Sequence, residues 1–66
     1  MPSSNIKGYS VSYPAEARDA VINHLYTKEA EDEFARANSQ VPVFFFYGDA
    51  KYKLSCFDHS CKVEKQ

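Results

Sequence analysis

The chain has 66 residues, a net charge of −1 and a sequence pI of about 6.0. This length makes one domain, near the size at which a single hydrophobic core gives only marginal stability and oligomerisation is a common remedy. The 44% hydrophobic and 15% aromatic composition excludes an intrinsically disordered chain, and the slightly negative charge argues against a general affinity for nucleic acids or anionic membranes.

The amino-terminal segment has no basic run followed by an apolar core, so it does not have the pattern of a secretory signal. The longest apolar run, residues 41–47, is much shorter than the ~20 residues that a transmembrane helix needs. We therefore expect a cytoplasmic location and no membrane partner. Residues 1–5 are predicted to be a disordered tail, and residues 6–66 a single α+β domain.

Residues 6–13 show the alternation of a half-buried strand, with Tyr9, Val11 and Tyr13 on one side. Pro14 ends this strand and suits the first turn of a helix. Apolar residues at spacings of three and four along 21–37 predict that one side of the helix packs on a sheet, while acidic residues take the other side.

The continuity of this helix is open, because a single helix over 15–37 would be about 35 Å long, more than a small sheet needs. We favour one long helix, since no Gly or Pro interrupts it. The alternative is a second helix capped by Thr27, whose first turns carry the acidic run of 29–33 that a helix N-terminus favours. That acidic run is otherwise interpreted as a solvated helix face.

Residues 41–57 are predicted to form a β-hairpin around a two-residue turn at Gly48 and Asp49. This register sets four apolar or aromatic pairs on the core face: Tyr47/Ala50, Phe45/Tyr52, Val43/Leu54 and Val41/Cys56. The alternate side chains point the other way, because strand side chains have a period of two, and a helix can cover only one face. The second face therefore carries the candidate partner-binding residues: Phe44, Phe46, Phe57, Lys51 and Lys53.

The element order β-α-β-β predicts an α+β fold in which one long amphipathic helix packs on a small, mainly antiparallel sheet. Residues 61–65 have the composition of a short fourth strand or of a frayed end.

Cys56, His59 and Cys61 bring two thiols and an imidazole within six residues, which resembles half of a zinc site. A structural zinc takes four ligands and the spacing supplies no complete set, so no metal ligand is assigned, and a zinc-stabilised domain is only the third hypothesis. The alternative is a hairpin with residues 57–60 as its loop and Cys56 opposite Cys61. For a cytoplasmic chain we expect both thiols to be reduced rather than joined in a disulfide.

No catalytic residue and no cofactor is assigned. Nucleophilic catalysis needs a thiol or hydroxyl held by an oriented base, and Cys56 or Cys61 with His59 supplies at most two members of such a set. His24 is interpreted as a partly exposed structural histidine. The protein is therefore predicted to be non-enzymatic.

The aromatic face is predicted to hold a protein partner or a second copy of the chain as a homodimer, because aromatic side chains favour interface cores. Inhibition of a host protein by a phage or mobile-element protein is a hypothesis from size alone. The alternative function is a single-stranded nucleic-acid-binding module, in which bases stack on the same phenylalanines and lysines follow the phosphates. The net negative charge makes this alternative the weaker one.

Overall fold

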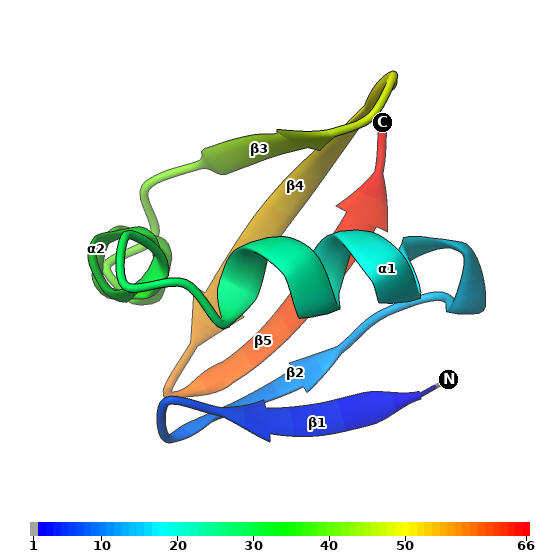
Figure 1. Ribbon diagram of the computed structural model, residues 1–66. Coiled ribbons are helices and arrows are strands. Elements are labelled where there is room, and N and C mark those ends of the chain that lie inside the picture. The colour runs from blue at the N-terminus through cyan, green and yellow to red at the C-terminus, as the bar shows by residue number, and fades with distance from the viewer. Residues whose placement is uncertain (1) are drawn as a thin grey trace.

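The structure, a computed structural model, describes residues 2–66 and shows a five-stranded mixed sheet with helical segments on one of its faces (Figure 1). The strands are β1 (Ser3–Ile6), β2 (Tyr9–Ser12), β3 (Val43–Tyr47), β4 (Ala50–Phe57) and β5 (Ser60–Lys65). Their order across the sheet is β1-β2-β5-β4-β3, and all neighbours are antiparallel except β2 and β5, which are parallel. The last of these strands in the sequence thus lies at the centre, and β1 and β3 form the two edges.

The helical region consists of short segments. The 3-10 turn η1 (Ala15–Ala17) leads into α1 (Arg18–Ala20) and a π-type turn, η2 (Val21–Leu25), and α2 (Ala30–Asn38) follows separately. Thr27 lies at the break, where its hydroxyl donates to the carbonyl oxygen of His24 at 2.7 Å and its N–H donates to the same oxygen at 3.2 Å. Thr27 therefore closes the first helical segment, whereas the N-cap of α2 is Glu29, without a side-chain cap bond.

The predicted β-α-β-β fold with one long amphipathic helix on a small, mainly antiparallel sheet is therefore wrong. The helix is interrupted at Thr27, and the sheet has five strands because a hairpin precedes the helices. Lys7 and Gly8 form the turn of this hairpin with φ of 54° and 87°, so residues 6–13 are not one strand. Residues 3–5 of the predicted tail belong to β1, and Met1 lies outside the described residues.

The hairpin of β3 and β4 has the predicted register over three pairs: Val43/Leu54, Phe45/Tyr52 and Tyr47/Ala50. Gly48 opens the turn with a φ of 61°, a conformation that glycine adopts without steric cost. The fourth predicted pair, Val41 with Cys56, does not form. The N–H of Val41 instead donates to the carbonyl oxygen of Arg36 at 3.0 Å, and β3 begins two residues later.

The turn at residues 39–40, directly after α2, explains why Val41 leaves the hairpin. Gln40 has a left-handed φ of 66°, and its N–H donates to the carbonyl oxygen of Ala37 at 2.9 Å. Together with the bond from Val41 to Arg36, this makes a Schellman-type end for α2, with Gln40 where glycine is usual.

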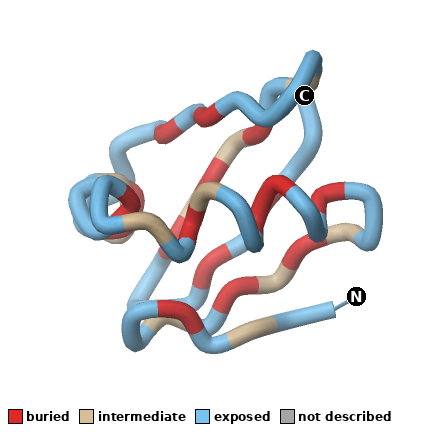
Figure 2. Tube along the Cα trace, viewed as in Figure 1, coloured by how far each residue is buried: buried red, intermediate tan, exposed pale blue. Residues whose placement is uncertain are grey.

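The hydrophobic core lies between the helical segments and one face of the sheet. Buried positions alternate with exposed ones along the strands, which is the pattern of a sheet covered on one side (Figure 2). The largest fully buried side chains come from both layers: Phe34, Ile6, Leu25, Leu54, Val11, Val21 and Val63.

A disulfide joins Cys56 of β4 to Cys61 of β5. The two residues face each other in the β4–β5 register, as the hairpin alternative predicted, but the prediction of reduced thiols is wrong. The turn is also tighter than predicted, because Phe57 pairs with Ser60 and only two residues connect the strands. The bond links two strands of the sheet interior, and such a covalent staple compensates for the small core of a short domain.

Candidate interaction surface

The predicted partner-binding phenylalanines project from the sheet face that the helices leave uncovered. Phe44 and Phe46 of β3 are 44% and 68% exposed, and Phe57 at the end of β4 is 69% exposed. Strand alternation produces this exposure, because Val43 and Phe45, on the opposite side of β3, are both 3% exposed.

Each of the two predicted lysines lies opposite a phenylalanine. Lys53 pairs with Phe44 and Lys51 pairs with Phe46 across the β3–β4 ladder. The Lys51 Nζ also reaches diagonally over the Phe44 ring, at 4.5 Å from its centroid, which is a cation–π distance. Phe44, Phe46, Lys51 and Lys53 thus form one continuous surface, termed the β3 patch.

Phe57 shares the face but not the β3 patch. It lies four residues beyond Lys53 along β4, a separation of about 13 Å at a rise of ~3.3 Å per residue. Its opposite neighbour is Ser60 of β5. The structure therefore brings together four of the five predicted residues and places the fifth at the other end of β4.

The rest of the uncovered face is small or charged. Lys53 pairs across to Glu64, and Lys62 lies between Ser55 and Ser12. Within residues 2–66, this face has one lysine–glutamate contact, in which the Lys62 Nζ lies 4.0 Å from the Glu64 Oε2. Both side chains are half-exposed, so the contact adds little stability. Aromatic character on this face is thus concentrated along β3.

The outer edge of β3 has unpaired main-chain groups. Tyr47 and Ala50 flank a two-residue turn. In such a hairpin the flanking pair exchanges both main-chain hydrogen bonds, so Tyr47 and every second β3 residue before it direct their N–H and C=O toward β4. Those of Phe44 and Phe46 point away from the sheet. A second bond supports this assignment: the Gln66 N–H donates to the Lys51 carbonyl oxygen at 2.8 Å, so the main-chain groups of Lys51 point toward β5 and not toward its partner Phe46.

Those outward groups stay unpaired throughout the part of the chain that the structure describes. The main-chain bonds outside the regular elements do not involve Phe44 or Phe46, and neither do the side-chain hydrogen bonds. The β3 patch is therefore bordered by a free strand edge, a feature that the sequence prediction did not include although the turn phase implies it.

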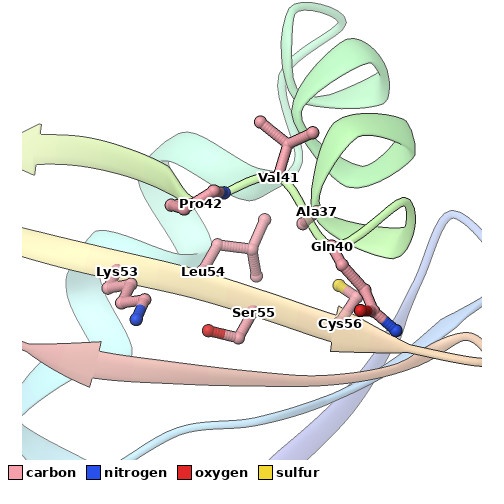
Figure 3. A pocket seen from close by; sticks show the side chains of 8 residues that line it. All are labelled: Ala37, Gln40, Val41, Pro42, Lys53, Leu54, Ser55 and Cys56. Atoms are coloured by element: carbon pink, nitrogen blue, oxygen red, sulfur yellow. The ribbon is translucent and has the colours of Figure 1, made fainter.

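A small cavity of about 210 Å³ opens where β3 stops pairing with β4 (Figure 3). Residues 53–56 of β4 form one wall, and the other wall consists of Ala37, Gln40, Val41 and Pro42. Small-molecule sites usually exceed ~300 Å³ and hold a few convergent polar groups. We assign no ligand to this cavity.

A polar cluster on the helical side stabilises the fold. The His24 Nε2 lies 2.8 and 2.9 Å from the two carboxylate oxygens of Glu33, and this contact joins η2 to α2. The imidazole also stacks on Phe45, with a centroid distance of 4.6 Å and an interplanar angle of 3°. The His24 side chain is 27% exposed, as the interpretation of a partly exposed histidine predicted.

A column of three stacked rings, which the sequence did not predict, lies at one end of the sheet. Tyr9 of β2 stacks between Phe34 of α2 and His59 of the β4–β5 turn, with centroid distances of 4.7 Å on both sides. The N–H of His59 also donates to the Asn38 Oδ1 at 2.9 Å. These contacts hold a turn in which Asp58 and His59 both have positive φ, 52° and 64°. The sequence pattern predicted only that Tyr9 lies on the same side of its strand as Val11 and Tyr13, and it did not predict the stacking.

Residues 2–66 contain no group of three or more His, Cys, Asp and Glu side chains arranged to hold a metal ion. The two cysteines that suggested zinc are joined in the disulfide, and the His59 ring lies against Tyr9.

Nor does the described chain contain a helix of the length and apolarity needed to cross a lipid bilayer. Comparisons with protein-family models, with curated proteins and with solved structures found no match.

Proposed function

We propose that this protein is a non-enzymatic protein–protein interaction module that self-associates, or holds a partner protein, through the β3 patch. The observation that supports this most is the pair of phenylalanines, 44% and 68% exposed, side by side on an uncovered sheet face of a 66-residue chain. Burying a phenylalanine ring contributes roughly 1.5–3 kcal/mol, so association has a driving force of several kcal/mol before its entropy cost.

The composition of the β3 patch is that of a small interface core. Aromatic residues are enriched in interface cores, and charged groups occupy the rim. Phe44 and Phe46 supply the apolar centre, while Lys51 and Lys53 border it on β4. On this proposal the rings supply the affinity and the lysines contribute little.

Three observations favour a protein partner over single-stranded nucleic acid. Lys51 lies over the Phe44 ring and competes for the face on which a base would stack. Phe57, the third predicted stacking ring, is about 13 Å from Lys53 along β4. The net charge of −1 also opposes phosphate binding.

The cytoplasmic location and the inhibition of a host protein are further hypotheses that this proposal does not require. Disulfides are rare in cytosolic proteins of mesophiles, so the Cys56–Cys61 bond weighs against the cytoplasm.

The experiment compares Phe46→Lys with Phe57→Lys by analytical ultracentrifugation. The two rings are 68% and 69% exposed on the same face, but only Phe46 belongs to the β3 patch. We expect a wild-type dimer with a micromolar or lower Kd, a folded monomer for Phe46→Lys and an unchanged dimer for Phe57→Lys, with folding checked by circular dichroism.

Lys51→Ala and Lys53→Ala should leave the dimer nearly unchanged. A wild type that remains monomeric at millimolar concentration yet shifts a labelled single strand at physiological salt would replace this proposal with the nucleic-acid alternative. Equal loss of association in Phe46→Lys and Phe57→Lys would show that the β3 patch is not the interface.

A further inference from the structure

The unpaired main-chain groups of β3 match those of a second copy of the same strand. We propose that two copies join their β3 strands antiparallel across a twofold axis at Phe45, so that two five-stranded sheets become one continuous sheet. This inference rests on the proposed function, because Phe44 and Phe46 belong to the β3 patch.

The hydrogen-bond phase of the edge fits this arrangement. Phe44 and Phe46 direct their N–H and C=O outward, as the phase of the β3–β4 pairing requires. With the axis at Phe45, Phe44 of one copy lies opposite Phe46 of the second copy, and these two residues exchange both bonds as an antiparallel pair. Phe46 of the first copy and Phe44 of the second copy form the symmetry-related pair and also exchange both bonds. Every outward N–H and C=O of Phe44 and Phe46 in both copies is then hydrogen-bonded.

The side chains fit the same register. The strand reads Val-Phe-Phe-Phe-Tyr and is nearly palindromic about Phe45. On the uncovered face, Phe44 of each copy comes beside Phe46 of the other, with Cβ atoms roughly 4.5–5.5 Å apart, which makes a ladder of aromatic cross-strand pairs. On the opposite side, Val43 comes beside Tyr47 of the second copy and covers a ring that is 42% exposed in the single chain.

Charge favours this edge contact over stacking of the two uncovered faces. Lys51 and Lys53 lie on β4, so their equivalents are separated by three strand spacings, about 14 Å at ~4.8 Å each. That distance exceeds the Debye length of ~8 Å at physiological ionic strength. Face-to-face stacking would instead bring the two sheets within ~10 Å and confine Lys51, Lys53 and Lys62 of both copies in one interface. Within the described residues of β4 and β5, Glu64 is the only carboxylate on this face that would balance them.

The test measures amide hydrogen exchange of the wild type at concentrations below and above its dimer Kd. The amides of Phe45 and Tyr47 bond to β4 and should be protected at both concentrations. Those of Phe44 and Phe46 should exchange rapidly in the monomer and at least tenfold more slowly in the dimer.

A chemically synthesised chain with N-methyl-Phe46 provides the second measurement, because it loses the outward N–H and keeps the ring. The matched control is N-methyl-Asn5, which loses an outward N–H on the β1 edge. We expect the Kd to rise at least tenfold for the first and to stay unchanged for the second. A dimer whose Phe44 and Phe46 amides remain unprotected, with an unchanged Kd for N-methyl-Phe46, would overturn strand pairing and leave the proposed function standing. A wild type that remains monomeric would overturn both self-association and strand pairing.

Discussion

The two edges of the sheet have opposite chemistry. β1 is Ser-Ser-Asn-Ile and β3 is Val-Phe-Phe-Phe-Tyr, although both direct alternate main-chain groups outward. Proteins protect sheet edges by making them short, by placing charges or proline in them, or by covering them. β1 is short and polar, whereas β3 has no charge and no proline and carries Phe44 and Phe46, which are 44% and 68% exposed. The sheet thus has one protected edge and, at its opposite side, one unprotected edge, and the proposed pairing of β3 strands would cover the unprotected one.

The largest expected effect separates the two sides of β3. The Phe45 ring is 3% exposed and stacks on His24 and Tyr52, so Phe45→Ala should lower the free energy of unfolding by about 3–5 kcal/mol. Phe44→Ala should change it by less than ~1 kcal/mol in the monomer. Urea denaturation at low protein concentration measures both values. A larger loss for Phe44→Ala would contradict the assignment of faces.

Removing the disulfide tests whether the stability of both edge strands depends on the β4–β5 pair between them. A closed loop of six residues, from Cys56 to Cys61, predicts a loss of about 2 kcal/mol for the double variant Cys56→Ala/Cys61→Ala. Because the bond lies between β4 and β5, amide protection should fall in both β1 and β3. The reduced wild type should unfold at the same urea concentration as the variant. Loss of protection in β3 alone would show that the β1–β2 hairpin is held independently of the disulfide.

The chain enters β3 through a strained residue, which offers a stabilising change. Gln40 has a φ of 66°, so Gln40→Gly should raise the free energy of unfolding by up to about 1 kcal/mol. The neighbouring Ser39 has a φ of −91° and serves as the control, because Ser39→Gly gains nothing from left-handed geometry. Thermal denaturation of both variants measures the difference, and equal shifts would exclude relief of strain at Gln40.

The smallest effect is expected on the β1 edge. Asn5 is exposed and lies opposite Ser10, so Asn5→Lys should alter stability by no more than ~0.5 kcal/mol and leave the dimer intact. Sedimentation beside Phe46→Lys completes the comparison of the two edges. Dissociation by Asn5→Lys would mean that β1 also takes part in association.

The β3–β4 hairpin could be predicted because its determinants are local. Gly48 fixes the turn, and the period of two then assigns Phe45 to the core and Phe44 to the uncovered face. The same register, counted further along β4, would have shown that Phe57 lies apart. Pairing of Val41 failed because the end of α2 bonds its N–H first.

The N-terminal hairpin and the helix break were less accessible to sequence reasoning. Ser-Ser-Asn-Ile contains one apolar residue, Ile6, which is 1% exposed, so its four-residue strand carries almost no periodic signal. The helix ends at Thr27 through a hydroxyl bond to His24, without Gly or Pro to mark it. The Cys56–Cys61 pairing followed from the turn, but the redox state was inferred from an assumed compartment.

The central position of β5 has a consequence for the order of folding. Val11 pairs with Cys61 across 61 − 11 = 50 positions, while each hairpin closes over a two-residue turn. Hairpins form in roughly 1–10 μs, but closing a 50-residue loop costs about 3.5 kcal/mol of chain entropy. The parallel β2–β5 contact should therefore form last. Until it does, β5 presents a free edge to the β1–β2 hairpin of any neighbouring molecule, and concentrated refolding should yield dimers that have exchanged this hairpin.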